Sequence, residues 1–157
     1  MLKQILVLIL FIIICFAVAG IGSLFTMPSI ADWYAMLKKP GWTPPSWLFG
    51  PVWTVLYLSM AVAAWLVWRQ VGFKAALIPM VIFTIQLTLN LLWSIIFFGK
   101  HNIGLAMADI VLLWLSIAAT IFVFRQVNNM AGLLLVPYLL WVTFAAALNL
   151  SIWNLNR

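Results

Sequence analysis

The sequence predicts an all-α integral membrane protein built as a bundle of five transmembrane helices. Of its 157 residues, 68% are hydrophobic and 6% are charged, a balance far outside that of water-soluble domains. Five apolar runs reach the length of about 20 residues that a helix needs to cross a bilayer. We therefore expect a single domain covering residues 1–157, with helices at about 5–26, 46–68, 73–98, 103–124 and 130–153.

The first apolar run, which follows Lys3, has two interpretations. A basic residue, an apolar stretch and the small residues of 17–19 are also typical of a secretory signal peptide. The apolar character continues to Phe25, beyond the usual length of such a signal, which favours a retained helix. Small side chains on one face would permit close packing against a neighbouring helix; they belong to Cys15, Ala19, Gly22 and Thr26.

The segment from Lys38 to Tyr57, K-K-P-G-W-T-P-P-S-W-L-F-G-P-V-W-T-V-L-Y, is the only extended one that is not simply apolar. Its prolines fix φ and remove backbone donors, so a helix cannot begin before about Ser46, which fits as an N-cap. One interpretation is an interfacial loop with a tryptophan belt. The other is a stiff lid over a cavity, with Trp53 pointing inward. The segment supports the two interpretations equally.

The later helices are bounded by charged and turn-forming residues. The second ends at Arg69, the third has Pro79 in its early turns, and a tight turn at 99–102 leads into the fourth. Arg125 closes the fourth helix, and the fifth contains Pro137. Five spans place the two termini on opposite sides of the membrane.

Basic residues lie at the ends of the apolar runs, where Lys and Arg anchor to lipid headgroups. The net charge of +6 is therefore no sign of nucleic-acid binding. The two sides of the membrane carry equal numbers of basic residues, so the positive-inside rule does not choose an orientation. Those on the N-terminal side are Lys3, Arg69, Lys74 and Arg125, and those on the other side are Lys38, Lys39, Lys100 and Arg157.

Three of the predicted helices carry an aromatic stripe that includes a polar group, which is costly in hydrocarbon and therefore a functional candidate. The stripe on the third helix combines two amides with two aromatic rings on one face. The amides could line a cavity or bond to neighbouring helices, and the matching stripes on two other helices favour the cavity. The stripes are Trp53, Tyr57, Met60 and Ala64; Gln86, Asn90, Trp93 and Phe97; and Tyr138, Trp141, Ala145 and Leu148, with Asn149 beside the last.

Asp109 is the only carboxylate within a predicted span, with Ser116 and Thr120 on the same face. An acid in the membrane is a candidate for proton transfer, but no Lys, Arg or second acid shares its helix interior. We therefore favour a buried acid that bonds to a hydroxyl or an indole. The chain has no glutamate, and its single histidine, His101, lies in a turn, so we expect neither a nucleophile–base pair nor a metal site.

Several stretches are similar to those of a known family. They are W-Y-A-M-L-K-K-P-G-W-T-P-P and G-P-V-W-T-V-L-Y around the first loop, Q-L-T-L-N-L-L-W-S-I-I-F-F-G, A-D-I-V-L-L-W, V-P-Y-L-L-W-V-T-F-A-A-A-L-N and W-N-L-N. With these motifs the chain resembles the TspO/MBR family over nearly its whole length. That family includes the tryptophan-rich sensory proteins of bacteria and the mitochondrial translocator protein, or peripheral-type benzodiazepine receptor.

The resemblance implies a five-helix membrane protein, commonly a homodimer, that binds tetrapyrroles such as protoporphyrin IX and haem, with no obligatory cofactor. Benzodiazepine-type drugs and, in some members, sterols also bind. The resemblance places the pocket between the helices beneath the first loop, lined by Trp53, Asn90, Trp141, Tyr34, Trp42 and Ala145. The aromatic stripes add Tyr57, Trp93 and Tyr138, and Lys38 or Lys39 at the rim would attract a propionate.

The leading hypothesis is therefore a membrane receptor or sensor that binds tetrapyrroles in a tryptophan-lined pocket. The resemblance also implies two alternatives, a transporter of porphyrins or sterols and a light-dependent enzyme. Some bacterial members degrade protoporphyrin IX in light, a reaction attributed to the tryptophans that match Trp53 and Trp141. Eukaryotic members carry a sterol motif late in the fifth helix, and its absence from residues 148–157, L-N-L-S-I-W-N-L-N-R, fits a bacterial cell-envelope protein.

Overall fold

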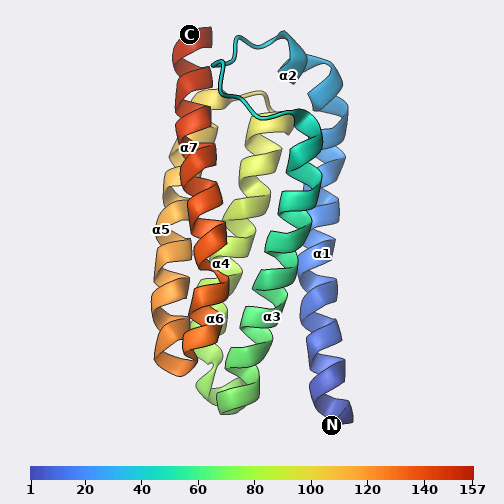
Figure 1. Cartoon of the computed structure of the whole chain (residues 1–157), viewed down its shortest axis with the longest axis vertical. Coiled ribbons are helices and arrows are strands. Elements are labelled where there is room, and N and C mark those ends of the chain that lie inside the picture. Colours follow the sequence, from blue (N-terminus) through green and yellow to red (C-terminus); the bar gives the residue numbers. More distant parts are fainter.

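Five long helical segments run up and down along a common axis in the computed structural model, which describes residues 1–157 (Figure 1). Each segment is long and apolar enough to cross a membrane, so the predicted five-helix bundle is confirmed and the chain is a multi-pass membrane protein. In chain order the elements are α1 (Leu2–Ala31), α2 (Trp33–Met36), the 3₁₀ turn η1 (Ser46–Leu48), α3 (Phe49–Ala75), α4 (Leu77–Ser94), the π-helical turn η2 (Ile95–Gly99), α5 (Ile103–Val127), α6 (Asn129–Leu134) and α7 (Val136–Asn156).

Three features of the helices differ from the prediction, because local backbone geometry overrides the apolar pattern. α1 continues past Pro28, which lies inside the helix. Gly72, with φ of 72° and ψ of 175°, turns the chain near the end of α3, and α4 begins only at Leu77. Leu135 separates α6 from α7, whose first turn holds Pro137. A helix tolerates proline in its first turn because the N–H groups there have no partner within the helix.

The start of the second span also differs from the prediction. Ser46 is not an N-cap, because its side chain makes no capping hydrogen bond. Ser46 instead begins η1, in which the Leu48 N–H donates to the Pro45 carbonyl at 3.0 Å. The backbone of Pro45 thus supplies the acceptor that a capping side chain would have supplied, and α3 follows directly.

The two ends of the bundle differ in what they carry (Figure 1). Residues 37–45, the C-terminus and the turn that follows η2 lie at one end, which we term the loop end. The N-terminus and the connections from α3 to α4 and from α5 to α6 lie at the other end. The termini therefore lie on opposite sides, as predicted.

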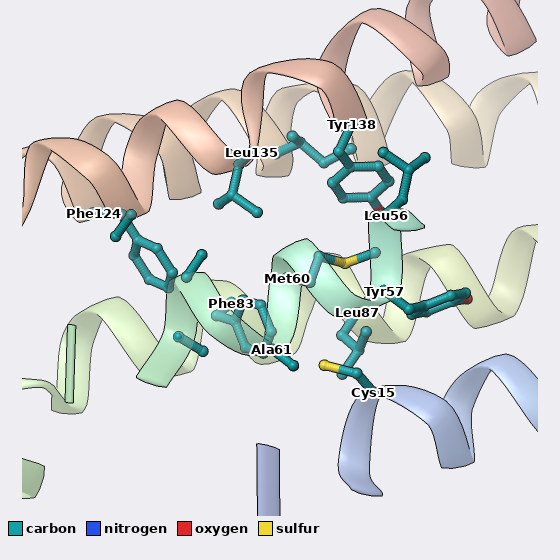
Figure 2. Close-up of a cluster of buried hydrophobic side chains, with 14 of the residues drawn as sticks. Cys15, Leu56, Tyr57, Met60, Ala61, Phe83, Leu87, Phe124, Leu135 and Tyr138 are labelled. Atoms are coloured by element: carbon teal, nitrogen blue, oxygen red, sulfur yellow. The ribbon is translucent and has the colours of Figure 1, made fainter. Parts of the chain in front are cut away.

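The core lies between α1, α3, α4, α5 and the last two helices (Figure 2). Small residues on α3, Ala61 and Ala64 among them, are fully buried and let the neighbouring helices approach closely, as small residues do in membrane bundles. Figure 2 shows Cys15 of α1 in the same cluster as Ala61 and Leu87. The small-residue face of the first helix is therefore partly a packing face.

α3 separates from the last helix toward the loop end. At the opposite end α3 packs against α6, but α3 and α7 are not among the closely packed helix pairs. α1 packs against α3 and α4, and α5 packs against α4, α6 and α7. The separation of α3 from α7 leaves room at the loop end for a cavity.

Candidate functional site

A cavity of about 850 Å³ lies between the helices at the loop end. Its walls come from α1, α3, α4 and α7, its loop end is formed by α2, η1 and η2, and α5 contributes no lining side chain. Most lining residues are hydrophobic and none is charged. Ligand pockets of roughly 300–1,000 Å³ with such a lining suit small apolar molecules, which the few polar groups orient.

A hydrogen-bonded amide forms the floor of the cavity. The Tyr57 hydroxyl donates to Asn90 Oδ1 at 2.5 Å, and Asn90 Nδ2 donates to the Tyr138 hydroxyl at 2.8 Å. Tyr57 and Asn90 line the cavity, whereas Tyr138 is 0% exposed and lies behind them. Both interpretations of the amide therefore hold for Asn90, since it joins α3 to α7 through α4 and also faces the cavity.

Gln86, the other amide of the third span, does not line the cavity. It lies one helical turn farther from the loop end and is almost fully buried. Its Nε2 donates to the Met60 sulfur at 3.8 Å, and its Oε1 has no hydrogen-bond partner. For Gln86 the structure supports the packing interpretation alone.

Three tryptophans form the walls, with Trp53 on α3, Trp93 on α4 and Trp141 on α7. Trp93 Nε1 donates to Asn149 Oδ1 at 3.2 Å, and Asn149 Nδ2 donates in turn to the Ile103 carbonyl at 3.0 Å, which fixes this indole. Among the tryptophans on the cavity, only Trp93 donates a hydrogen bond within the protein. The indoles of Trp53 and Trp141 therefore offer a ligand both an apolar face and an N–H donor.

The π-helical turn η2 brings two further rings to the cavity. Its geometry is marked by the bond from the Lys100 N–H to the Ile95 carbonyl at 2.8 Å, five residues back. Phe97 and Phe98 are consecutive and both line the cavity, and Phe97 stacks on Trp93 with ring centroids 5.0 Å apart. Single π turns of this kind occur often at functional sites.

α1 forms a wall that the sequence analysis did not assign to ligand binding. Ala19, Gly22 and Thr26 line the cavity. A Cβ on Gly22 would lie 3.5 Å from Ser94 Oγ, so this glycine also packs closely against α4. The small-residue face predicted on this helix was the available signal. This face packs against a neighbouring helix where one is close, and it lines the cavity where none is.

Most of the predicted ligand-binding residues line the cavity; they are Tyr34, Trp53, Tyr57, Asn90, Trp93, Trp141 and Ala145. Trp42 lies outside the lining, because its ring packs edge-on against Phe144 with centroids 5.6 Å apart and remains half exposed. Trp47 lines the cavity and is also 72% exposed. The loop therefore combines the two interpretations, with Trp42 and Trp47 at the surface and Trp53 on the cavity.

Lys39 is not a free cation at the rim. Its Nζ donates to the carbonyls of Tyr34, Ala35 and Leu37 at 2.7, 3.3 and 3.1 Å, and it lies 4.8 Å from the centroid of the Tyr34 ring. It thus binds the carbonyls at the C-terminal end of α2, where a cation is favourable. An ammonium has three donors, so none is left for a ligand, and Lys39 does not line the cavity.

Lys38 acts through its backbone. Its N–H donates to Asn156 Oδ1 at 3.0 Å, and Asn156 Nδ2 donates to the Lys38 carbonyl at 2.9 Å. This pair ties the first loop to the end of α7. The Lys38 side chain is exposed and lies outside the cavity lining.

Asp109 lies within α5, away from the cavity lining. Its Oδ2 is buried without a hydrogen-bond partner. The predicted bond from a hydroxyl or an indole is therefore wrong for this oxygen. The hydroxyls on its face are already taken, because Ser116 and Thr120 donate to backbone carbonyls of their own helix at 2.8 and 2.7 Å.

Comparison with known proteins identifies the family. Residues 11–154 match the TspO/MBR family. The chain belongs to the TspO/MBR family. It is 48% identical to the tryptophan-rich protein TspO of Chlorobaculum tepidum over 98% of both chains. It is also 41% identical to the translocator protein of Homo sapiens, over 87% of this chain and 82% of that one. The tryptophan-rich protein TspO of Archaeoglobus fulgidus is 42% identical over 98% of this chain and 99% of its own. The predicted membership is confirmed.

The TspO/MBR motifs seen in the sequence surround the cavity, with two exceptions. One is A-D-I-V-L-L-W on α5, whose Trp114 donates to Thr143 Oγ1 of α7 at 2.8 Å and so joins two helices outside the cavity. The other is W-N-L-N at the end of α7, which places no side chain on the cavity. The motifs at the first loop, in the third span and at the start of α7 place side chains on the cavity; these include Tyr34, Trp53, Asn90, Trp93 and Trp141.

Proposed function

We propose that the protein binds tetrapyrroles, such as protoporphyrin IX or haem, in this cavity. The observation that carries the proposal is the set of three indole walls above a buried amide. A flat apolar macrocycle gains by stacking on the faces of Trp53, Trp93 or Trp141. Asn90 uses one of its two amide hydrogens for Tyr138, so the second is available to a polar edge of the ligand. Membership of the TspO/MBR family supports the same ligand class.

The uncharged lining bears on how such a ligand would be held. No Lys or Arg lines the cavity, so carboxylate groups of a porphyrin would lie toward the loop end, where Lys38 is exposed. The lining contains no His or Cys, two common haem ligands, and its residues of the other ligand types are Met27 at the exposed edge and the buried Tyr34 and Tyr57. Binding would therefore rest on the macrocycle, and we expect metal-free protoporphyrin IX and haem to bind with similar affinity.

Light-dependent degradation of the bound porphyrin is the second candidate function. It is favoured by the positions of Trp53 and Trp141, whose indoles line the cavity and would touch the pigment. In this reaction the excited porphyrin and an adjacent indole would exchange an electron while dissolved oxygen oxidises the macrocycle. A receptor needs the same contacts but catalyses no reaction, so an experiment under illumination distinguishes the two functions.

The test is a titration of the purified protein in detergent with protoporphyrin IX, followed in the dark by quenching of tryptophan fluorescence. The same samples are then illuminated while porphyrin absorbance is recorded. Saturable quenching is expected for the wild type. Absence of saturable quenching would overturn the proposal, and apolar ligands such as sterols and benzodiazepine-type drugs would then be titrated in its place.

Two variants sharpen the result. Trp141→Phe keeps an aromatic face, so dark binding should largely survive, whereas light-driven pigment loss should stop if the protein is an enzyme. Trp42→Phe is the matched control, because Trp42 lies outside the lining, and it should change neither. Pigment loss that is equal in the wild type and Trp141→Phe would leave a binding or sensing protein. Light scattering on the same samples tests the homodimer that the family resemblance implies.

A further inference from the structure

We infer that the ligand enters the cavity laterally from the hydrocarbon core of the bilayer, through a slot between α1 and α3. The inference rests on the proposed function, because it concerns how a bilayer-dissolved porphyrin would reach the site. Nine residues line the cavity and are also exposed, and we define the slot by six of them. They are Gly20, Ser23 and Met27 of α1, and Trp47, Gly50 and Thr54 of η1 and α3. The other three are Phe16, Ala31 and Ser46.

The exposed lining residues indicate where the cavity opens to the outside of the protein. The lining residues contributed by α4, η2 and α7 are all buried or half-buried. The slot residues on α1 recur three and four residues apart, and so do those on η1 and α3, which puts each set on one helix face. Two exposed stripes that border one cavity and belong to neighbouring helices mark the edges of an opening between those helices.

The slot has a closed lower end. The rings of Phe16 and Tyr57 approach to 6.5 Å between centroids at the level of the cavity floor. Farther from the loop end α1 and α3 are in contact, and Trp65 Nε1 donates to the Gln4 carbonyl at 2.9 Å. The two helices are thus joined along one half of their length and apart along the other.

Close packing behind α1 holds the slot open. A Cβ on Gly22 would lie 3.5 Å from Ser94 Oγ, and a Cβ on Gly99 would lie 2.8 Å from Phe25 Cδ1. α1 is therefore seated against α4 and η2 through glycines on both sides of the contact. Its position against these elements keeps it from closing onto α3.

The slot is apolar and faces lipid. α1 and α3 both belong to membrane-spanning segments, so the surface outside the slot meets acyl chains. The hydroxyls of Ser23 and Thr54 donate to the carbonyls of Gly20 and Gly50 in their own helices, at 2.7 and 2.9 Å. Their hydrogen-bond donors are thereby satisfied, and an apolar molecule passes without displacing a bond between the helices.

Gly20 and Gly50 are the two positions that control the width of the slot. A Cβ at either position would have nothing within 4 Å, so a side chain introduced there starts in open space. We expect Gly20→Phe and Gly50→Phe each to lower the association and dissociation rates of protoporphyrin IX about tenfold, with an affinity within about twofold of the wild type. An obstacle in an access route changes both rates equally and leaves the bound state alone.

Gly41→Phe is the matched control. Gly41 also has nothing within 4 Å of a Cβ, but it lies in the first loop and does not line the cavity. The association and dissociation rates of protoporphyrin IX with Gly41→Phe should equal those with the wild type. Slot variants whose rates stay within about twofold of the wild type would overturn the inference. So would a lower affinity at an unchanged association rate, because the new side chain would then occupy the cavity and not the access route.

A spin label tests the slot without any porphyrin. Cys15 is the only cysteine and is fully buried, so a label attaches selectively to Ser23→Cys in protein reconstituted into phospholipid bilayers. We expect this label to collide more with dissolved oxygen than with a water-soluble nickel chelate, and a label on Gly41→Cys to do the reverse. A Ser23 label that meets mainly the chelate would overturn lateral access. Wild-type protein that binds no porphyrin, together with an oxygen-accessible Ser23 label, would reject the proposed ligand and not the slot.

Discussion

Replacing Asn90 by leucine is expected to destabilise the bundle by about 2 kcal/mol. Two interhelical hydrogen bonds are lost, to Tyr57 and Tyr138, and such bonds in membrane proteins are worth about 0.6 kcal/mol each. The Tyr57 hydroxyl borders the cavity and can find another partner there. The Tyr138 hydroxyl has no exposed surface, and leaving it without its donor adds about 1 kcal/mol or more.

A second substitution isolates the buried hydroxyl. In a Tyr138→Phe background, Asn90→Leu no longer leaves an unpartnered phenol, so its cost should fall to about 1 kcal/mol or less. The difference between the two backgrounds measures the coupling between Asn90 and Tyr138. Gln86→Leu is the matched control one turn away on the same helix. The Oε1 of Gln86 already lacks a partner, so this substitution should leave the free energy of unfolding unchanged or raise it.

The assay is equilibrium unfolding in mixed micelles with increasing sodium dodecyl sulfate, followed by tryptophan fluorescence. The midpoint and slope give the free energy of unfolding for each variant. The reasoning is refuted if Asn90→Leu costs no more than Gln86→Leu, or if its cost is the same in both backgrounds. Either result would mean that Asn90 contributes to the cavity but not to the joining of the helices.

Three further predictions use the same preparations. Gly72→Ala should lower the free energy of unfolding by about 1–3 kcal/mol, because φ of 72° with ψ of 175° is strained for any residue but glycine; a cost under about 0.5 kcal/mol would contradict that strain. Lys39→Met should speed hydrogen exchange of the amides around α2, since the capping ammonium is lost, and Lys38→Met should not; equal protection in both variants would rule out the cap. Burial raises the pKa of the Tyr34 phenol above its ordinary value, so above about pH 10 the unfolded chain loses this proton before the folded protein does, and stability falls as pH rises. Tyr34→Phe should make that fall shallower, and identical pH profiles for the two proteins would contradict the assignment.

The aromatic walls were predictable because they lie on regular helices. Trp53, Asn90 and Trp141 sit in stripes whose spacing follows the helical period, and a regular helix preserves that spacing in the structure. The part played by α1 was not predictable in the same way. A run that is apolar all round has no contrast between faces, so only the small residues Ala19 and Gly22 hinted at it.

Features that depend on backbone geometry escaped the sequence pattern altogether. Lys39 is a basic residue in the first loop, and the sequence therefore suggested a cation at the rim. Its bonds to the end of α2 depend on a short helix that the apolar pattern does not predict. The turn at Gly72 and the π turn that brings Phe97 and Phe98 to the cavity are local departures from the α-helix. Such departures are decided by tertiary packing.

The bond pair between Lys38 and Asn156 bears on the order in which the molecule is assembled. The two residues are 118 positions apart in the sequence. Chains generally fold from the N-terminus as they are synthesised, so the first loop emerges long before its anchor exists. The loop can be secured only after the final span has entered the bilayer. A nascent chain with four inserted spans would therefore carry an unfinished site, and the ability to retain a ligand would be acquired at the last step of biogenesis.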